Sequence, residues 1–264
     1  MEGSVIALLC RTSDRDARAA EGARALAEAL AERSGTEARM VGSPEEPRDG
    51  TWEEDLRDSR GCLLEAGGQV QDALAEGRYP IITAGDCSVS VGTLPALARQ
   101  RPDAYVLWLD AHADFNSTET TGSGYLGGMC LAGACGVWDT GFGGDLDPAR
   151  VVMCGVRDVD AGEQVLLATK GVGLVDTPGR LAETLRGLPV FVHLDLDVLD
   201  PDALPAAVPA PGGFSDGGLR TLLAEVAGAC DVIGVEITAL IAPERARRVA
   251  TIIEPLLSRT APVG

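Results

Sequence analysis

The chain of 264 residues lacks the features that mark several classes of protein. Basic residues are scarce, because 22 Lys and Arg stand against 40 Asp and Glu and give a net charge of -18. The phosphate backbone of nucleic acids attracts basic surfaces and repels acidic ones, so no nucleic-acid partner is expected. No uninterrupted apolar run approaches the roughly 20 residues of a membrane-spanning helix, so no membrane partner is expected either.

The amino terminus and the cysteines exclude further classes. The opening residues MEGSVIALLC have no basic segment and no small-residue cleavage site, so we expect a cytoplasmic protein without a secretory signal. The seven cysteines form no close CxxC pair, which fits neither a disulfide framework nor a zinc ribbon. Four of them lie in apolar runs and are expected to act as small buried hydrophobes: Cys10, Cys62, Cys154 and Cys230.

Apolar, β-rich runs alternate with helical patterns along the whole chain. Strands are expected at 4–10, 37–41, 79–85, 103–112, 150–156, 172–176, 189–198 and 231–240. Helices are expected at 16–35, near 52–75, from Ser88, near 160–170 and near 243–258. Strands that are apolar on both faces and separated by helices indicate a parallel sheet covered on both sides. The predicted fold is a three-layer α/β domain spanning residues 1–264, with a central, mainly parallel sheet.

Three irregular segments, 114–128, 139–148 and 200–216, are rich in Gly, Pro, Ser and Thr. They are candidates for active-site loops, because ligands of such sheets bind beyond the carboxyl ends of the strands. The stretch GSGYLGG at 122–128 lacks the GK[ST] ending of a nucleotide loop, so phosphate binding is not expected.

Side chains that bind metals collect at the ends of the expected strands. The stretch WLDAHADFN places Asp110, His112 and Asp114 at every second position, which in an extended segment directs all three to one face. Asp195 and Asp197 repeat this spacing in HLDLDV. Crowded, buried carboxylates repel one another and lose hydration unless cations neutralise them. This oxygen-rich set with an imidazole favours Mn²⁺, with Mg²⁺ or Fe²⁺ as alternatives, and two such ions can activate a bridging water.

Two further residues near these motifs are favoured for structural roles over metal binding. His193 begins the buried HLDLD stretch, where a core or supporting role is favoured over direct ligation. Asp200 precedes Pro201 and is favoured as a turn residue.

These motifs resemble those of the ureohydrolases, the arginases, agmatinases and formiminoglutamases that hydrolyse guanidino groups at a dimanganese centre. AGDCS is similar to the family's GGDHS, DAHAD to DAHxD, and DLDVLDP to DxDxxDP, and the likeness covers nearly the whole chain. The resemblance implies an arginase-like fold, a possible homo-oligomer, and catalytic roles for Asp110 and Asp195, which would bridge both Mn²⁺ ions, and for Glu236, which would bind the guanidinium group. The implied metal ligands are Cys87, Asp110, His112, Asp114, Asp195 and Asp197.

The resemblance also implies a guanidino amino acid as substrate. GVRDVDAGE at 155–163 is most similar to the arginase version, in which Asp160 and Glu163 would receive the α-amino group. Asn116 and Ser123 correspond to residues that bind the α-carboxylate. Tyr125 replaces a second Asn of the family, and its role stays open between packing over the substrate chain and reaching the carboxylate.

Two departures from the family pattern concern the chemistry. Cys87 stands where the family has a His ligand, and Mn²⁺ prefers a thiolate less, so one metal should bind weakly; a buried thiol that does not bind metal is the alternative. Gly127 stands where the family has a His assigned to proton transfer. General acid help of this kind is typically worth about 10²–10⁴-fold in rate. L-Arginine should therefore be a poor substrate.

The residues expected to bind the substrate are retained, whereas the His assigned to proton transfer is missing. A substrate that depends less on general acid catalysis is consistent with both features. Nω-Hydroxy-L-arginine has a less basic guanidino group, and its hydrolysis gives L-ornithine and hydroxyurea. The pattern resembles a branch of the ureohydrolases that acts on this compound and likewise has Cys at the ligand position. Two alternatives stay open: an arginase or related guanidino hydrolase, and an inactive metal-binding homologue, against which the retained set of substrate-binding residues speaks.

Overall fold

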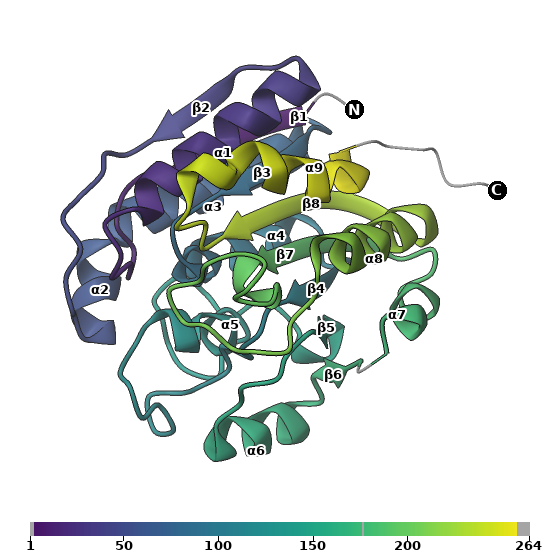
Figure 1. Ribbon diagram of the computed structural model, residues 1–264. Helices are drawn as coiled ribbons and strands as arrows, with labels where there is room; N and C mark the ends of the chain where they lie inside the picture. Colours follow the sequence, from purple (N-terminus) through teal and green to yellow (C-terminus); the bar gives the residue numbers. More distant parts are fainter. Residues whose placement is uncertain (1–2, 176, 258–264) are drawn as a thin grey trace.

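Eight strands form one sheet in the order β2-β1-β3-β8-β7-β4-β5-β6, as seen in the computed structural model, which describes residues 3–175 and 177–257 (Figure 1). Every neighbouring pair runs parallel, which confirms the predicted fold class. The strands are β1 (Gly3–Leu8), β2 (Ala38–Val41), β3 (Tyr79–Thr83), β4 (Tyr105–Leu109), β5 (Val151–Cys154), β6 (Gly173–Leu174), β7 (Pro189–Asp195) and β8 (Asp231–Thr238).

Helices cover both faces of this sheet and give the expected three layers. Side chains of α1 (Ala19–Ser34), α7 (Pro178–Thr184), α8 (Asp216–Ala229) and α9 (Ala246–Leu257) share one hydrophobic core with the sheet. Side chains of α3 (Arg60–Ala75), α4 (Ser90–Gln100) and α5 (Cys130–Ala134) form the core on the other face. The short α2 (Trp52–Asp58) precedes α3, and α6 (Ala161–Lys170) lies near the β6 edge (Figure 1).

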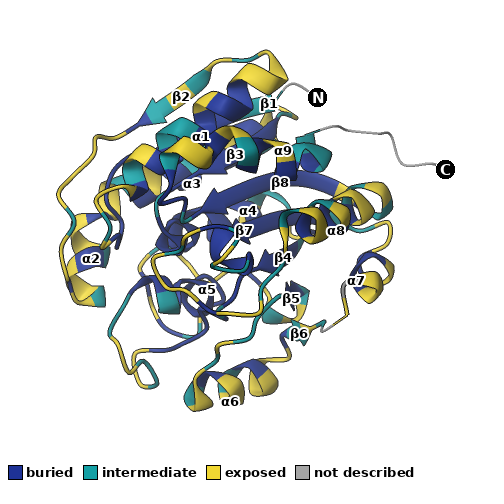
Figure 2. Cartoon of the chain, viewed as in Figure 1, coloured by how far each residue is buried: buried dark blue, intermediate teal, exposed yellow. Residues whose placement is uncertain are grey.

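Strand β1 shows why the apolar runs form a doubly covered sheet. Val5 and Ala7 belong to the core beneath α1 and α9, whereas Ile6 and Leu8 belong to the core beneath α3 and α4. Successive side chains of a strand point to opposite faces, so an unbroken apolar run supplies both cores. The central strands are buried while the outer faces of the helices are exposed (Figure 2).

Some expected elements differ in extent. The helix expected near 52–75 is divided at Ser59, whose hydroxyl donates to the carbonyl of Asp55 at 2.6 Å, a local bond that disturbs a continuing helix. Helices α5, α7 and α8 were not expected, because glycines near the start of α5 and α8 and inside α7 weaken the helical pattern. Residues 176 and 258, predicted to end a strand and a helix, lie outside the described residues.

One expectation about the cysteines is wrong. Cys10 and Cys62 form a disulfide with a Cα–Cα distance of 6.5 Å across 52 positions of sequence, because the sheet brings the end of β1 beside α3. Disulfides are rare in the reducing cytosol, so this bond is unusual for the expected cytoplasmic location. Cys154 and Cys230 are buried, as expected. Within the described part of the chain, no helix is long and apolar enough to cross a membrane.

Candidate metal and substrate site

The carboxyl ends of six strands, β1, β3, β4, β5, β7 and β8, surround a cavity of about 560 Å³. The turn after β3 contributes Asp86 and Cys87, and the segments after β4 and β7 contribute most of the carboxylates. Chain order and strand order diverge at this place, since β8 and β7 separate β3 from β4. Ligands of open parallel sheets bind at such a switch point, so the position of the cavity itself indicates function.

The first group of possible ligands is Asp110, His112 and Asp197, whose ligand atoms all lie within 4.8 Å of one another. The Nδ1 atom of His112 lies 3.0 Å from Oδ2 of Asp197 and 3.5 Å from Oδ1 of Asp110. Burial lowers the pKa of His112, but the hydrogen bonds to the two carboxylates outweigh it and raise the pKa to about 12. Without metal, this imidazole therefore carries the positive charge that the two acids require.

Strand geometry alone does not bring these side chains together. Strand β4 ends at Leu109, so Asp110, His112 and Asp114 lie in the turn beyond it rather than in an extended segment. Asp110 Oδ1 accepts the backbone N–H of His112 at 2.7 Å, and Asp114 has the unusual positive φ of 50°. The convergence predicted from alternation is thus produced by a turn, which Asp tolerates better than most residues.

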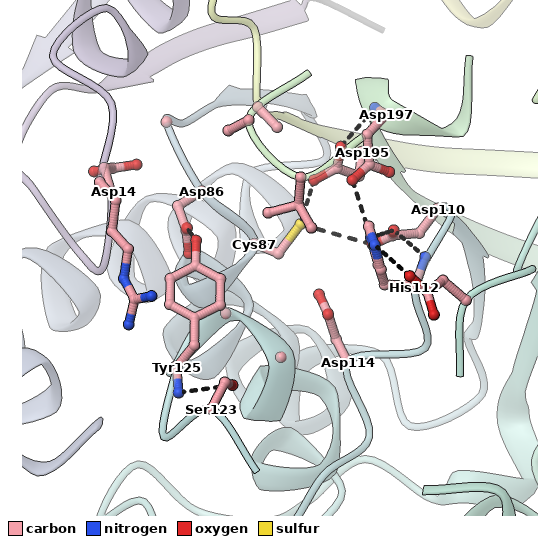
Figure 3. Close-up of a pocket in the computed structure, with 18 of the residues that line it drawn as sticks. Asp14, Asp86, Cys87, Asp110, His112, Asp114, Ser123, Tyr125, Asp195 and Asp197 are labelled. Atoms are coloured by element: carbon pink, nitrogen blue, oxygen red, sulfur yellow. Dashed lines mark hydrogen bonds and ion pairs between the residues drawn. The ribbon is translucent and has the colours of Figure 1, made fainter. Parts of the chain in front are cut away.

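Cys87 lies at the centre of the second group, with Asp110 and His193. Its thiol donates to Oδ2 of Asp195 at 2.8 Å (Figure 3). The sulfur also lies 3.3 Å from Nε2 of His193. Burial and then the charges of Asp195 and Asp110 raise the thiol pKa well above its ordinary value of 9.0. The thiol therefore stays protonated near neutral pH unless a cation displaces the proton.

The remaining two candidate ligands complete the acidic cluster. Asp195 Oδ1 accepts the backbone N–H of Asp197 at 2.7 Å, and burial followed by the charge of Asp197 raises the pKa of Asp195 to about 7. Asp114 lines the cavity outside both three-residue groups, and burial and the charge of Asp110 raise its pKa well above 3.8. Both carboxyl groups therefore keep their protons to a higher pH than usual, and a nearby cation would favour their ionised forms.

Glu236 does not lie where the guanidinium-binding role places it. Its side chain is fully buried and does not line the cavity. It accepts hydrogen bonds from Ser90 and Thr93, and its Oε1 lies 2.9 Å from Nδ1 of His193. His193 in turn stacks on Trp108 with ring centroids 3.5 Å apart. The structure therefore gives Glu236 and His193 a supporting position beneath Cys87.

The residues expected to bind the amino acid end of a substrate all line the cavity: Asn116, Ser123, Tyr125, Asp160 and Glu163. The amide of Asn116 donates to Oδ2 of Asp160 at 3.1 Å, so these two expected receptors also contact each other. Glu163 is buried and accepts the backbone N–H groups of Phe115 at 2.7 Å and Asp160 at 3.2 Å. It thus fixes the loop as well as facing the cavity.

Tyr125 fills the place beside Gly127. Its hydroxyl donates to Oδ2 of Asp86, so the end of the ring lies against this carboxylate (Figure 3). A Cβ atom at position 127 would lie 2.6 Å from Cε1 and 2.9 Å from Cζ of this ring. A side chain at 127 and the observed Tyr125 conformation therefore exclude each other.

Among the cavity residues that were not proposed for the site from the sequence are Asp14, Arg15 and Asp16, which follow β1. Asp14 is buried and its Oδ1 has no hydrogen-bond partner, and burial and then Asp86 raise its pKa to about 8. Their position after a strand was the available signal, because the same rule pointed to Asp110 and Asp195.

The donor set fits divalent cations. His112 Nε2 is buried without a hydrogen-bond partner, so one side of this imidazole is left for another ligand. Several carboxylates are buried against one another, which raises their pKa values, and a bound cation removes that penalty. Oxygen and imidazole donors suit Mn²⁺, whereas the Cys87 thiol is softer than Mn²⁺ prefers.

Known proteins resemble this chain in sequence and in fold. The model of the arginase family matches residues 12–253. The N(omega)-hydroxy-L-arginine amidinohydrolase of Streptomyces lavendulae is 38% identical over 256 residues, covering 96% of this chain and 93% of that protein. An arginase of Bacillus caldovelox is 35% identical over 55% of this chain and 56% of its own length. The solved arginase structure from Bacillus subtilis strain 168 has a TM-score of 0.84 at 24% identity, covering 98% of this chain and 99% of that one.

Proposed function

The chain belongs to the arginase family, whose members are metal-dependent hydrolases of amidines, and from this premise we propose that it hydrolyses Nω-hydroxy-L-arginine to L-ornithine and hydroxyurea. The observation that carries the choice of substrate is the packing of Tyr125 into the space beside Gly127. This packing leaves no room for an imidazole at 127, so a leaving group that needs a strong proton donor is disfavoured. The similarity to the Streptomyces lavendulae protein supports the same substrate.

The amino acid end of the substrate would bind at the mouth of the cavity. Asp160 and Glu163 offer carboxylate oxygens to the α-ammonium group, and Asn116 and Ser123 offer polar groups to the α-carboxylate. A decarboxylated amine would leave the carboxylate receptors without a partner, which costs binding free energy. An amino acid is therefore preferred over agmatine.

The guanidino end would face the cluster of Asp110, His112, Asp195 and Asp197. We propose that these residues, with Asp114 and Cys87, hold two Mn²⁺ ions, of which the ion beside Cys87 binds more weakly. If bound there, the ions would lower the pKa of a coordinated water and make hydroxide available near neutral pH for attack on the guanidino carbon. Glu236 keeps His193 oriented through the 2.9 Å contact and so fixes the position of Cys87.

We propose that the chain serves D-cycloserine biosynthesis as the step that supplies hydroxyurea. A homo-oligomer and a cytoplasmic location remain part of this proposal.

The test is to offer Mn²⁺-loaded protein L-arginine and Nω-hydroxy-L-arginine in the same reaction and to identify the products by mass spectrometry. Hydroxyurea in large excess over urea is expected, and an Asp110→Asn variant, which loses a carboxylate shared by both ligand groups, should form neither. Urea and hydroxyurea at equal rates would indicate an arginase-like hydrolase. Tight ligand binding by calorimetry with no product would indicate an inactive homologue.

A further inference from the structure

The cavity carries a strongly unbalanced charge. Nine aspartates and one glutamate line it, and among the described lining residues Arg15 is the sole Lys or Arg. An α-carboxylate that enters such a surface is repelled unless a cation lies close to it. The neutral groups of Asn116 and Ser123 do not supply that charge.

The groups expected to bind this carboxylate are also partly occupied. The Asn116 amide donates to Asp160 at 3.1 Å, and the Oδ1 atom of Asn116 accepts from Thr120 at 2.9 Å. The hydroxyl of Tyr125 donates to Asp86 and is therefore already used. The carboxylate subsite therefore needs a further donor.

Arg15 is placed to be that donor. Its guanidinium carbon lies 4.6 Å from the centroid of the Tyr125 ring, and Tyr125 donates its backbone N–H to Ser123 Oγ at 3.2 Å. The aromatic face holds the planar guanidinium by a cation–π contact without using its N–H groups. The only ion pair of Arg15 in the described chain is a 3.5 Å contact with Asp49, whose side chain is 90% exposed.

We propose that Arg15 binds the α-carboxylate of the substrate and so determines specificity for an amino acid, an inference that rests on the proposed function. Tyr125 then acts as the platform for Arg15, and its hydroxyl bond to Asp86 fixes the ring. The adjacent Asp16 does not compete for Arg15, because both of its oxygens accept from Arg18, at 3.0 Å and 2.7 Å. The guanidinium of Arg15 offers two parallel N–H donors, which match a carboxylate.

The experiment compares wild type with Arg15→Gln, Arg15→Lys and the control Arg101→Gln. Arg101 pairs with Asp103 at 2.9 Å and does not line the cavity, so the control removes the same charge elsewhere. Calorimetry on Mn²⁺-loaded protein measures the binding of L-ornithine and of putrescine, which lacks the carboxylate. Steady-state kinetics with Nω-hydroxy-L-arginine separate KM from kcat.

Loss of Arg15 should weaken L-ornithine about tenfold and raise KM by a similar factor with little change in kcat, as expected for one partly exposed charge-assisted hydrogen bond. Putrescine should bind as well as before or better, and Arg15→Lys should restore part of the loss. L-Ornithine affinity within about twofold of wild type, equal weakening of both ligands, or no L-ornithine binding by wild type would overturn the inference. Absence of hydroxyurea from wild type that still binds L-ornithine through Arg15 would overturn the proposed function alone.

Discussion

Replacement of Cys87 by His should tighten the weaker Mn²⁺ site by at least about 100-fold at pH 7. Mn²⁺ binds a thiolate, and burial with the charges of Asp195 and Asp110 raises the pKa of this thiol well above 9.0. Removing a proton from a group of pKa 9 at pH 7 costs about 2.7 kcal/mol, because each pKa unit is worth 1.36 kcal/mol. The same carboxylates would also raise the pKa of an imidazole at this position, but its ordinary pKa is about 2 units below that of a thiol, and burial lowers it, so its proton is removed at least about 2.7 kcal/mol more easily. A difference of about 2.7 kcal/mol is a factor of about 100 in the dissociation constant.

The cavity has room for the larger ring, because Cys87 lines a space of about 560 Å³. Metal content after dialysis and competition against a fluorescent chelator give the number of bound ions and the affinity of the weaker one. Cys87→Ala should weaken that ion further, whereas Cys230→Ala removes a buried thiol at the opposite end of β8 and should change neither quantity. Urea formation from L-arginine should rise in Cys87→His as occupancy increases. Equal stoichiometry and affinity in wild type, Cys87→His and Cys87→Ala would refute the ligand role.

Three further outcomes are expected. Gly127→Ala should lower the free energy of unfolding by about 1–3 kcal/mol, because the new Cβ would meet the Tyr125 ring. Urea denaturation should show no such loss when the same change is made in a Tyr125→Ala variant. Equal losses in both backgrounds would contradict the steric clash. Burial and neighbouring carboxylates raise the pKa of Asp195 to about 7 and that of Asp197 to about 6. The folded state therefore binds more protons than the unfolded state between these values and the ordinary carboxyl pKa. The free energy of unfolding of the metal-free protein should fall as pH rises from about 4 to 7. Mn²⁺ binds the ionised forms, so the rise in Tm that it produces should be larger at pH 8 than at pH 5, and a pH-independent rise would argue against these ligands. Glu236→Gln should lower the free energy of unfolding by about 2–4 kcal/mol, because buried donors lose a charged acceptor; unchanged stability with a raised KM would instead indicate substrate contact.

The sheet was predictable because its signal is local. The central strands carry apolar runs long enough to serve both cores, as β1 and β7 show, and the helices between strands require parallel order. Helix α8 was missed because its first turn contains Gly217 and Gly218, while the Ser215 side chain that begins it accepts the N–H of Gly218. The Cys10–Cys62 disulfide was missed because only the packing of α3 beside β1 brings those positions together.

The site was predictable in its residue types and less so in its geometry. Asp110 and His112 could be found because ligand-type residues follow an apolar strand, and the cavity confirms that they lie together. The burial of Glu236 could not be read from the sequence, because alternation in a strand gives the face of the sheet but not the height along it. Arg15 could not be predicted either, since the role that we propose for it depends on its cation–π contact with Tyr125, which lies far along the chain.

The packing of Tyr125 against Gly127 also constrains the order in which mutations could accumulate. Any lineage that gained a side chain at 127 first would meet a steric barrier, whereas one that first shortened residue 125 would not. Changes at the two positions are therefore epistatic, and directed evolution toward a proton-donating imidazole at 127 should recover a smaller residue at 125 before, or together with, the new histidine.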